Sequence, residues 1–401
     1  MRILQVIPFF YPAEAYGGPV PGAYHLSKEL VRRGHEVVVY TTDTLDSSTR
    51  QKASYLEIQG VKVHYFRNLS NSLAWRRLFF APGMICQLRK EIKTFDVIHL
   101  QDYRNFQNTV IHHYARKYNV PYLLQAHGSV VAFFQKRTLK RIFDWVWGYK
   151  ILKDAAKLIA LTPLEVEQYK SMGISDDKIK IVANGIDLSE FENLPQIGEF
   201  RKKYGIENDQ KIILYLGRIF RSKGLELLAN AFANILKDFS EVKLVITGPD
   251  DGFLPTLKKL IKEHKIEEKV LFTGPLYGRD KLEAYVDADV YVLPSIYETF
   301  PITVLEACAC GLPVVVTDRC GIADIINGQV GLVVPYDRNQ LGDTVLRMLT
   351  DDKIRQQFGE KGKALVREKF DWSKIVEQLE DIYQGVLTKA TKKISEKRYY
   401  E

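Results

Sequence analysis

The stretch VYVLPSIYETFPITVLEACACGLPVVV, residues 290–316, decides the class of fold. It begins and ends with short apolar runs rich in Val, and a segment long enough for a helix lies between them. Strands that are apolar along almost their whole length belong to parallel sheets that helices cover on both faces. The stretch therefore predicts a strand, a loop, a helix and a second parallel strand in an α/β protein.

The same alternation extends along the chain in both directions. Short apolar runs separated by amphipathic stretches occur at residues 3–7, 36–40, 61–66, 97–101, 122–126, 158–161, 179–183, 211–216, 242–247, 270–273, 290–293, 314–317 and 332–334. The pattern restarts after Asn184-Gly185-Ile186-Asp187, and the periodicity is lost over the next stretch, which contains Pro and Gly. We expect two doubly wound, Rossmann-like domains at residues 1–187 and 206–372, with a linker at 188–205.

A helix is predicted as the last regular element. Ser373 can cap its start, and its apolar residues fall on one helical stripe: Ile375, Val376, Leu379, Ile382, Tyr383, Val386 and Leu387. We place this helix at residues 373–390. Residues 391–401 are polar and lack a period, so a frayed tail is expected there.

The composition is that of a globular protein with more than one domain. Its 401 residues include 46% apolar and 26% charged side chains and only four cysteines. No run reaches the roughly 18 apolar residues of a membrane span, and Gln5 and Pro8 interrupt the apolar N-terminus that would otherwise resemble a signal peptide. We therefore expect a cytoplasmic protein in a reducing compartment.

Positive charge is concentrated in the first half of the chain. Residues 1–190 carry 26 Lys and Arg against 17 Asp and Glu, a net of +9, whereas residues 191–401 carry 31 against 32, a net of −1. The basic residues are accompanied by aromatic ones: Trp75, Phe79, Phe80, Phe133, Phe134, Trp145 and Trp147. Such a face suits an anionic membrane or an anionic acceptor, although solvated helix faces would carry the same charges. No nucleic-acid partner is expected, because no recognition motif accompanies the charge.

Two glycine-containing loops follow predicted strands and precede predicted helices. Gly17 and Gly18 follow the first strand, where backbone N–H groups and a helix start can approach an anion. The pair is not the dinucleotide fingerprint, and a structural turn is the alternative. In the second loop, Gly217 to Gly224, Arg218 and Lys223 are two cations that can hold a diphosphate without a metal. Surface cations on a loop are the alternative reading.

The strongest constellation is the quoted stretch itself. Glu298 lies in its loop and Glu306 lies inside its helix, eight positions later. A helix start offers N–H groups to phosphate, and carboxylates accept hydrogen bonds from sugar hydroxyls. A glycosidase with two carboxylates is the competing interpretation, and the structural one is an exposed Glu with a capping Glu.

Taken together, these motifs resemble those of retaining nucleotide-sugar glycosyltransferases with the GT-B fold, family 4 (glycosyl transferases group 1). The resemblance extends from residue 17 to residue 315. The segments that carry it are Gly17-Gly18, Ala126-His127-Gly128, Asn184-Gly185-Ile186-Asp187, Gly217-Arg218, Lys223-Gly224, the pair Glu298 and Glu306, and Ala309-Cys310-Gly311-Leu312-Pro313-Val314-Val315. As a set they are highly specific, although each one alone is not.

The resemblance implies a donor site mainly on the second domain. Glu306 would accept from ribose hydroxyls, Arg218 and Lys223 would hold the diphosphate, and Glu298 would contact the transferred sugar. The remaining implied contacts are N–H groups of Phe300, Ile302, Thr303 and Val304, the Gly17–Gly18 turn over the phosphates, and His127 near the reacting centre. Pro301 is a departure from many relatives, which have Gly there, and it removes one N–H donor.

The resemblance also implies a mechanism with retention and without an enzyme nucleophile. The leaving diphosphate would act as the base toward the acceptor hydroxyl, and the two cations would stabilise its growing charge. No cofactor and no metal are expected. Asp287-Ala288-Asp289 matches a metal-binding pattern of another glycosyltransferase fold, but it precedes a strand, so we interpret it as part of a helix–strand junction. In this fold the C-terminal helix returns to the first domain.

The predicted activity is therefore transfer of a sugar from a UDP- or GDP-sugar to a glycan or lipid-linked acceptor in cell-surface glycan or glycolipid assembly. Residues 75–80, with Trp75 and two arginines, predict peripheral contact with the inner face of an anionic membrane. A small soluble acceptor, with this segment simply packed, is the alternative. The same scaffold would also suit a sugar-nucleotide 2-epimerase, a phosphorylase or a sugar-binding module.

Overall fold

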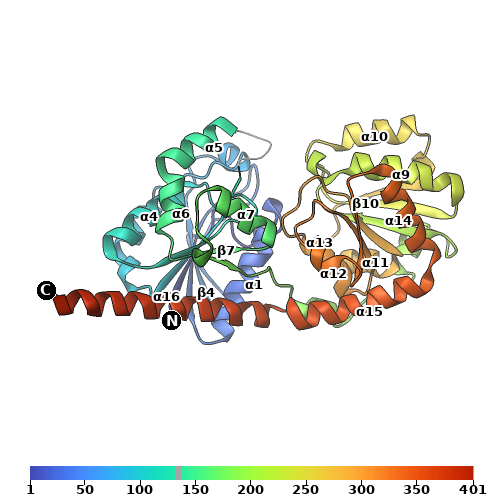
Figure 1. The fold of residues 1–401 in the computed structure, drawn as a ribbon. Helices are drawn as coiled ribbons and strands as arrows, with labels where there is room; N and C mark the ends of the chain where they lie inside the picture. The colour runs from blue at the N-terminus through green and yellow to red at the C-terminus, as the bar shows by residue number, and fades with distance from the viewer. Residues whose placement is uncertain (132–136, 401) are drawn as a thin grey trace. The chain divides into compact units, whose positions relative to one another are not determined.

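The computed structural model describes residues 1–131 and 137–400, with side chains through residue 389. The chain forms two compact units, Met1–Gly185 together with the segment from Trp372 onward, and Ile186–Asp371. Each unit is a sheet, mainly or fully parallel, between helices, as Figure 1 shows. None of the helices in the described ranges is long and apolar enough to cross a membrane.

The sheet of the first unit is parallel except for one edge strand. Its order is β3-β4-β2-β1-β5-β6-β7-β8. The strands are β1 (Arg2–Val6), β2 (Glu36–Thr42), β3 (Tyr55–Ile58), β4 (Val61–Phe66), β5 (Val97–Gln101), β6 (Tyr122–Gln125), β7 (Lys157–Ala160) and β8 (Ile179–Ile181). Leu4 of β1 pairs with Val38 on one side and Ile98 on the other. The order of the strands therefore reverses between β1 and β5, and a doubly wound sheet binds ligands at such a point.

Helices cover both faces of this sheet. They are α1 (Pro19–Arg32), α2 (Asn71–Trp75), α3 (Met84–Glu91), α4 (Phe106–Tyr118), α5 (Arg137–Phe143), α6 (Tyr149–Asp154), α7 (Pro163–Ser171) and α16 (Trp372–Tyr400). Successive residues of β1 enter different cores: Ile3 packs with Leu379 of α16, and Leu4 packs with Ile111 of α4. This alternation explains why the strands are apolar on both faces.

The second unit is a fully parallel sheet in the order β11-β10-β9-β12-β13-β14. Its strands are β9 (Lys211–Leu216), β10 (Val242–Thr247), β11 (Val270–Gly274), β12 (Val290–Leu293), β13 (Val314–Thr317) and β14 (Gly331–Val334). The helices are α8 (Glu199–Tyr204), α9 (Leu225–Asp238), α10 (Leu254–Glu263), α11 (Gly278–Asp287), α12 (Ile302–Ala309), α13 (Ala323–Ile326), α14 (Arg338–Thr350) and α15 (Asp352–Lys369). The strand order reverses between β9 and β12.

The structure confirms every strand predicted from the sequence and adds β3, which the sequence analysis missed. β3 pairs antiparallel with β4 through a two-residue turn at Gln59 and Gly60, whose φ angles are 49° and 81°. Only alternate residues of β3 are half-buried. The strand therefore lacks the continuous apolar run by which the parallel strands were recognised.

Two terminal segments of the predicted domains differ from expectation. The stretch 188–205 is not an open linker, because it contains α8 and belongs to the second unit. Phe200 of α8 is buried, and the Asp287 carboxylate accepts from the backbone N of Gly198 and Arg201 at 2.5 and 2.9 Å. At the other end, α16 continues to Tyr400 through the predicted tail. The sequence after Gly385 contains no Gly or Pro that would end a helix.

Candidate functional site

The reversal point of the second sheet brings two predicted loops together. The loop at residues 217–224 follows β9 and the loop at 294–301 follows β12. The backbone N of Ile296 donates to Ser222 O at 2.8 Å. Gly224 has a φ of 70°, and a Cβ added there would lie 1.8 Å from Pro294 O. Glycine is required at this position because the two backbones touch.

Lys223 and Glu298 form an ion pair across these two loops. The ammonium Nζ of Lys223 contacts Oε2 of Glu298, and both side chains are mostly buried, with 19% and 17% exposed. The backbone holds Glu298 in place, because its N donates to Arg319 O at 3.2 Å and its O accepts from Gly321 N at 2.7 Å. The structure therefore brings these two predicted residues into direct contact.

Arg218 points toward a different loop. Its Nη1 lies 2.6 Å from Oδ2 of Asp251, in the loop after β10, and both side chains are nearly half exposed. The hydroxyl of Tyr215 donates to the carbonyl oxygen of Arg218 at 2.8 Å and fixes its backbone. Arg218 and Lys223 are thus each paired with a carboxylate of their own. A phosphate that binds them would exchange places with these carboxylates.

Glu306 of α12 is fixed by two residues of α11 that the sequence analysis did not single out. Its Oε1 accepts from Lys281 Nζ at 2.7 Å, and its Oε2 accepts from the Tyr285 hydroxyl at 2.8 Å. Burial alone would lower the pKa of Lys281, but the adjacent Glu306 carboxylate outweighs it and raises the pKa. Each carboxylate oxygen has about two acceptor positions, so Glu306 can still accept from ribose hydroxyls.

The start of α12 presents backbone N–H groups beside these carboxylates. In the described part of the chain no side chain caps its first turn, and the capping position is Pro301. Thr303 Oγ1 lies 2.7 Å from the hydroxyl of Tyr291, which also lies 3.0 Å from Leu216 O. Phe300 is buried, with 7% of the residue exposed. A helix start of this kind suits phosphate.

In the first unit, Gly17 and Gly18 lie between β1 and α1. Gly17 has a φ of 89°, which explains the glycine there, and Gly18 occupies the capping position of α1. A Cβ added at either residue would meet nothing within 4 Å in the described part of the chain. Packing therefore does not require these two glycines, and their backbone is open to a ligand.

His127 follows β6 in a strained turn. His127 and Gly128 both have positive φ angles, 50° and 81°, and such a conformation is unfavourable for a non-glycine residue. Burial lowers the pKa of His127 to about 4, so its ring is neutral at pH 7. Its Nε2 is buried and has no hydrogen-bond partner among the described residues. The turn thus holds a neutral imidazole with one buried ring nitrogen that is unpaired within the described part of the chain.

A buried carboxylate that the sequence analysis missed holds this turn. Glu165 of α7 accepts from the backbone N of Gly128 at 2.6 Å and from that of Leu161 at 2.7 Å. Burial raises the pKa of Glu165 to about 7. The hydrogen bonds from the two backbone N–H groups lower this pKa, but their effect is smaller than that of burial. The only sequence signal was an acidic residue in the first turn of a helix, which normally indicates an exposed residue near the helix dipole.

The residues expected to face a membrane near Trp75 do not all do so. Phe79 is buried, and Arg77 donates from Nη2 to Tyr16 O at 3.0 Å, with its guanidinium over the Phe9 ring. Trp75 is half exposed and packs edge-on against Tyr16. Arg77 is exposed although its guanidinium lies over these rings, so contact of this segment with a membrane stays a prediction. Phe133 and Phe134 lie outside the described residues.

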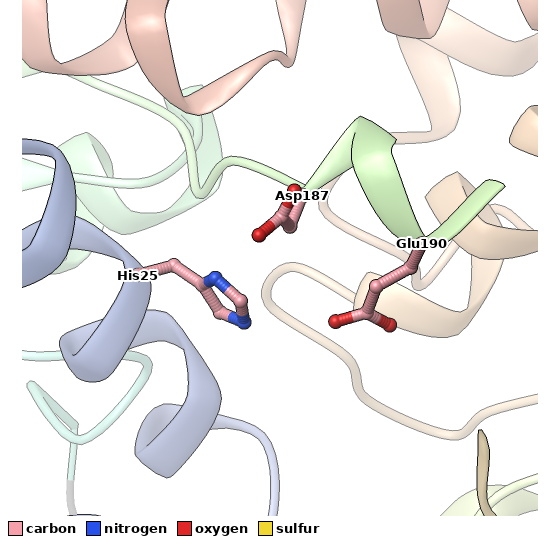
Figure 2. A group of neighbouring side chains, drawn as sticks. All are labelled: His25, Asp187 and Glu190. Atoms are coloured by element: carbon pink, nitrogen blue, oxygen red, sulfur yellow. The ribbon is translucent and has the colours of Figure 1, made fainter. Parts of the chain in front are cut away.

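Asp287 and Asp289, which the sequence predicts to lie at a helix–strand junction, have roles in the fold. Asp289 accepts from Ile212 N at 2.8 Å, and Asp287 holds α8, which confirms the predicted junction. Asp187 caps a short turn by accepting from Ser189 N at 3.1 Å. Figure 2 shows Asp187 and Glu190 on this turn, and His25 on α1.

Comparisons with known proteins identify the family of the chain. The profile of the family described as Glycosyltransferase Family 4 matches residues 16–190, and that of Glycosyl transferases group 1 matches residues 196–365. An uncharacterized glycosyltransferase of Methanocaldococcus jannaschii is 30% identical over 95% of this chain and 97% of its own. The phosphatidyl-myo-inositol mannosyltransferase of Mycobacterium leprae is 28% identical over 98% and 99%.

The fold is also that of solved structures. The structure of Anabaena HepE in complex with UDP superposes with a TM-score of 0.76 at 18% identity and covers 96% of this chain and 100% of its own. The GT-B arrangement consists of two doubly wound sheets and a C-terminal helix that packs in the core of the first unit. The chain therefore belongs to the family 4 glycosyltransferases, the glycosyl transferases of group 1.

Proposed function

We propose that the protein transfers a sugar from a nucleoside-diphosphate sugar, a UDP- or GDP-sugar, to an acceptor hydroxyl with retention of configuration and without a metal. The observation that carries the proposal is the Lys223–Glu298 ion pair at the reversal point of the second sheet. It sets a cation for phosphate and a carboxylate for sugar hydroxyls beside the start of α12. HepE, which shares the fold, binds UDP.

In this proposal the donor lies along the carboxyl ends of β9 and β12. Glu306 keeps acceptor positions for the ribose, because Lys281 and Tyr285 each occupy only one. The diphosphate forms ion pairs with Lys223 and Arg218 and displaces their carboxylate partners. Glu298, released from Lys223, accepts from hydroxyls of the transferred sugar. Binding thus replaces ion pairs within the protein by ion pairs to the donor.

Catalysis follows from charge that grows on the leaving diphosphate. Arg218 and Lys223 stabilise that charge, and a phosphate oxygen takes the proton of the acceptor hydroxyl on the same face of the sugar. His127 is neutral and offers Nε2 to a sugar hydroxyl. It orients the sugar. The reaction therefore requires neither a protonated histidine nor a side-chain nucleophile.

The acceptor is a glycan or a lipid-linked molecule at the inner face of the cell membrane. The M. leprae relative is named for a phosphatidylinositol acceptor and matches this chain over almost its whole length. Residues 1–190 carry a net charge of +9, against +8 for the whole chain. That charge suits an anionic acceptor or an anionic lipid surface.

The experiment is a donor screen followed by product analysis. UDP, GDP and ADP are tested by thermal shift, since a ligand at a hundredfold its Kd stabilises the native state by about 2.7 kcal/mol. We expect one of UDP or GDP to raise Tm in the wild type and less so in Lys223→Ala. Lys259→Ala, an exposed lysine of α10, is the matched control.

The sugar of the recognised nucleotide is then supplied, with acceptor and without it. The anomeric proton of the product, followed by NMR, should show retention, and donor alone should give slow hydrolysis. An epimerised nucleotide sugar from donor alone would instead identify a 2-epimerase. A product with inverted anomeric configuration would exclude the mechanism in which the leaving diphosphate acts as the base.

A further inference from the structure

We infer that the outer face of residues 137–153 is a membrane-docking surface for anionic lipid. The inference rests on the proposed function, because it supplies the surface on which a lipid-linked acceptor is met. In chain order the surface comprises α5, a π-helical turn at Asp144–Gly148, and α6, which follow one another without a break. Figure 1 shows α5 and α6 at the edge of the first unit.

Large apolar side chains form a stripe on this helical segment. They recur at intervals of three or four residues, which places them on one face. The exposed fractions of these four side chains are 60% for Leu139, 52% for Ile142, 80% for Trp145 and 41% for Tyr149. A contiguous exposed apolar patch marks a binding site or a membrane contact. Its aromatic members, Trp145 and Tyr149, favour the interface of a bilayer.

The charges that surround the stripe are of one sign. Exposed or partly exposed cations of the segment are Arg137, Lys140, Arg141, Lys150 and Lys153. The one acidic residue of 137–153, Asp144, is buried and paired with Arg104 at 2.7 Å. The outward face therefore presents apolar side chains between cations, and this complements an anionic lipid surface.

The segment is clamped to the loop that carries His127. Arg104 donates from Nε to Asp144 Oδ1 at 2.8 Å and from Nη2 to Val130 O at 2.8 Å, and it also donates to Ser129 O. Gly148 permits the approach, because a Cβ there would lie 2.4 Å from the Tyr103 hydroxyl. A membrane bound by the stripe would thus be held at a fixed position relative to the His127 loop.

This surface is more exposed than residues 75–80, the segment that the sequence predicts to contact a membrane. There, Phe79 is buried and the guanidinium of Arg77 lies over the Phe9 ring, and Trp75, Leu78 and Phe80 are less exposed, at 46%, 36% and 40%. By contrast, Trp145 has no ring contact in the described structure that would explain its position, and it is 80% exposed. The exposed apolar area and the positive charge coincide on 137–153.

The test is co-sedimentation of the full chain with vesicles of phosphatidylglycerol and phosphatidylcholine, and with phosphatidylcholine alone, at low and high salt. Binding should require phosphatidylglycerol and weaken with salt.

Trp145→Ala should lower the partition coefficient about tenfold through lost apolar contact. Arg141→Glu/Lys150→Glu should lower it at least about thirtyfold, at roughly 1 kcal/mol per cation. Ile197→Ala and Lys259→Glu/Lys262→Glu are exposed matched controls in the second unit and should bind as the wild type does.

Hydrolysis of the nucleotide sugar without acceptor is measured in parallel. It should be unchanged in every variant, so a failure of the transferase assignment would show in the wild type's hydrolysis and not in the vesicle assay. Equal vesicle binding by Trp145→Ala and the wild type would overturn the inference. So would absence of wild-type binding at low salt, or a soluble dimer that Trp145→Ala dissociates, which would make the stripe a contact between two copies of the chain.

Discussion

The candidate sites of the two units are built in opposite ways. In the second unit, charged side chains are paired with one another: Lys223 with Glu298, Arg218 with Asp251, and Lys281 with Glu306. In the first unit, the His127 turn is neutral and a buried carboxylate holds it through backbone N–H groups. Charged pairs suit a ligand that brings its own charge, whereas a neutral, fixed turn suits the orientation of hydroxyls. The comparison predicts that variants of the second unit lose phosphate chemistry and variants of the first lose geometry.

The largest effect is expected for Lys223→Ala. Loss of this cation removes leaving-group stabilisation of roughly 3 kcal/mol, so kcat should fall about a hundredfold or more. Arg218→Ala should act in the same direction. The measurement is steady-state transfer or donor hydrolysis, with Lys259→Ala as control. Near-normal kcat in both variants would show that the paired cations do not hold the diphosphate.

The second prediction separates the two carboxylates of the donor site. Glu306→Ala should weaken binding of the free nucleoside diphosphate about tenfold or more, because a charged hydrogen-bond acceptor for the ribose is lost. Glu298→Ala should spare nucleotide binding and lower kcat for the nucleotide sugar. Calorimetric titration with the diphosphate measures the difference. Equal affinity of the two variants would contradict the division of roles.

The third prediction concerns Glu165 in the first unit. Its folded-state pKa of about 7 lies above the ordinary value of 4.5, so the folded protein binds more protons than the unfolded chain between these values. Stability from this group therefore falls as pH rises through that window, by up to about 1.4 kcal/mol per pH unit. The variant Glu165→Gln cannot titrate at this position and should not show this loss of stability. As pH rises from 5 to 7, the free energy of unfolding of the variant should therefore increase relative to that of the wild type. Urea unfolding at several pH values measures it, and parallel profiles would refute the assignment.

The smallest effect is expected from metal removal. Because cations of the protein hold the phosphates, excess EDTA should leave kcat unchanged. A loss of activity that Mn²⁺ restores would show that a metal shares the work assigned to Arg218 and Lys223. It would also reopen the question whether Asp287 and Asp289 bind a metal.

The sequence predicted the fold well where apolar runs carried the information. Buried parallel strands are apolar on both faces, so their positions could be read directly. β3 escaped because it is an edge strand with one exposed face, although Gln59-Gly60 between two apolar residues is a hairpin signal. Position 188–205 was misread because α8 is short and is held by Asp287, a residue far away in the sequence.

The site was predicted only as far as local motifs reach. Arg218, Lys223, Glu298 and Glu306 stand in recognisable loops, but their partners Asp251, Lys281 and Tyr285 lie on other elements. Glu165 is similar, because its burial depends on how α7 packs. Arg77 shows another such limit, since its contacts with the rings of Phe9 and Tyr16 come from packing between segments far apart in the sequence. Packing between distant segments determines the partners and the burial of these side chains, and local sequence motifs do not predict it.

The entry of α16 into the first unit has a consequence for synthesis on the ribosome. Trp372, Ile375 and Tyr383 belong to the apolar core that contains Ile3 and Val37, and Trp372 lies against Gly185. The N-terminal unit therefore cannot complete its core when its own residues 1–185 emerge. At about 5–20 residues per second, it waits roughly 10–40 s for the helix. During that interval the second unit can fold first, so the order of folding is the reverse of the order of translation, and one face of the first sheet needs protection until the last residues arrive.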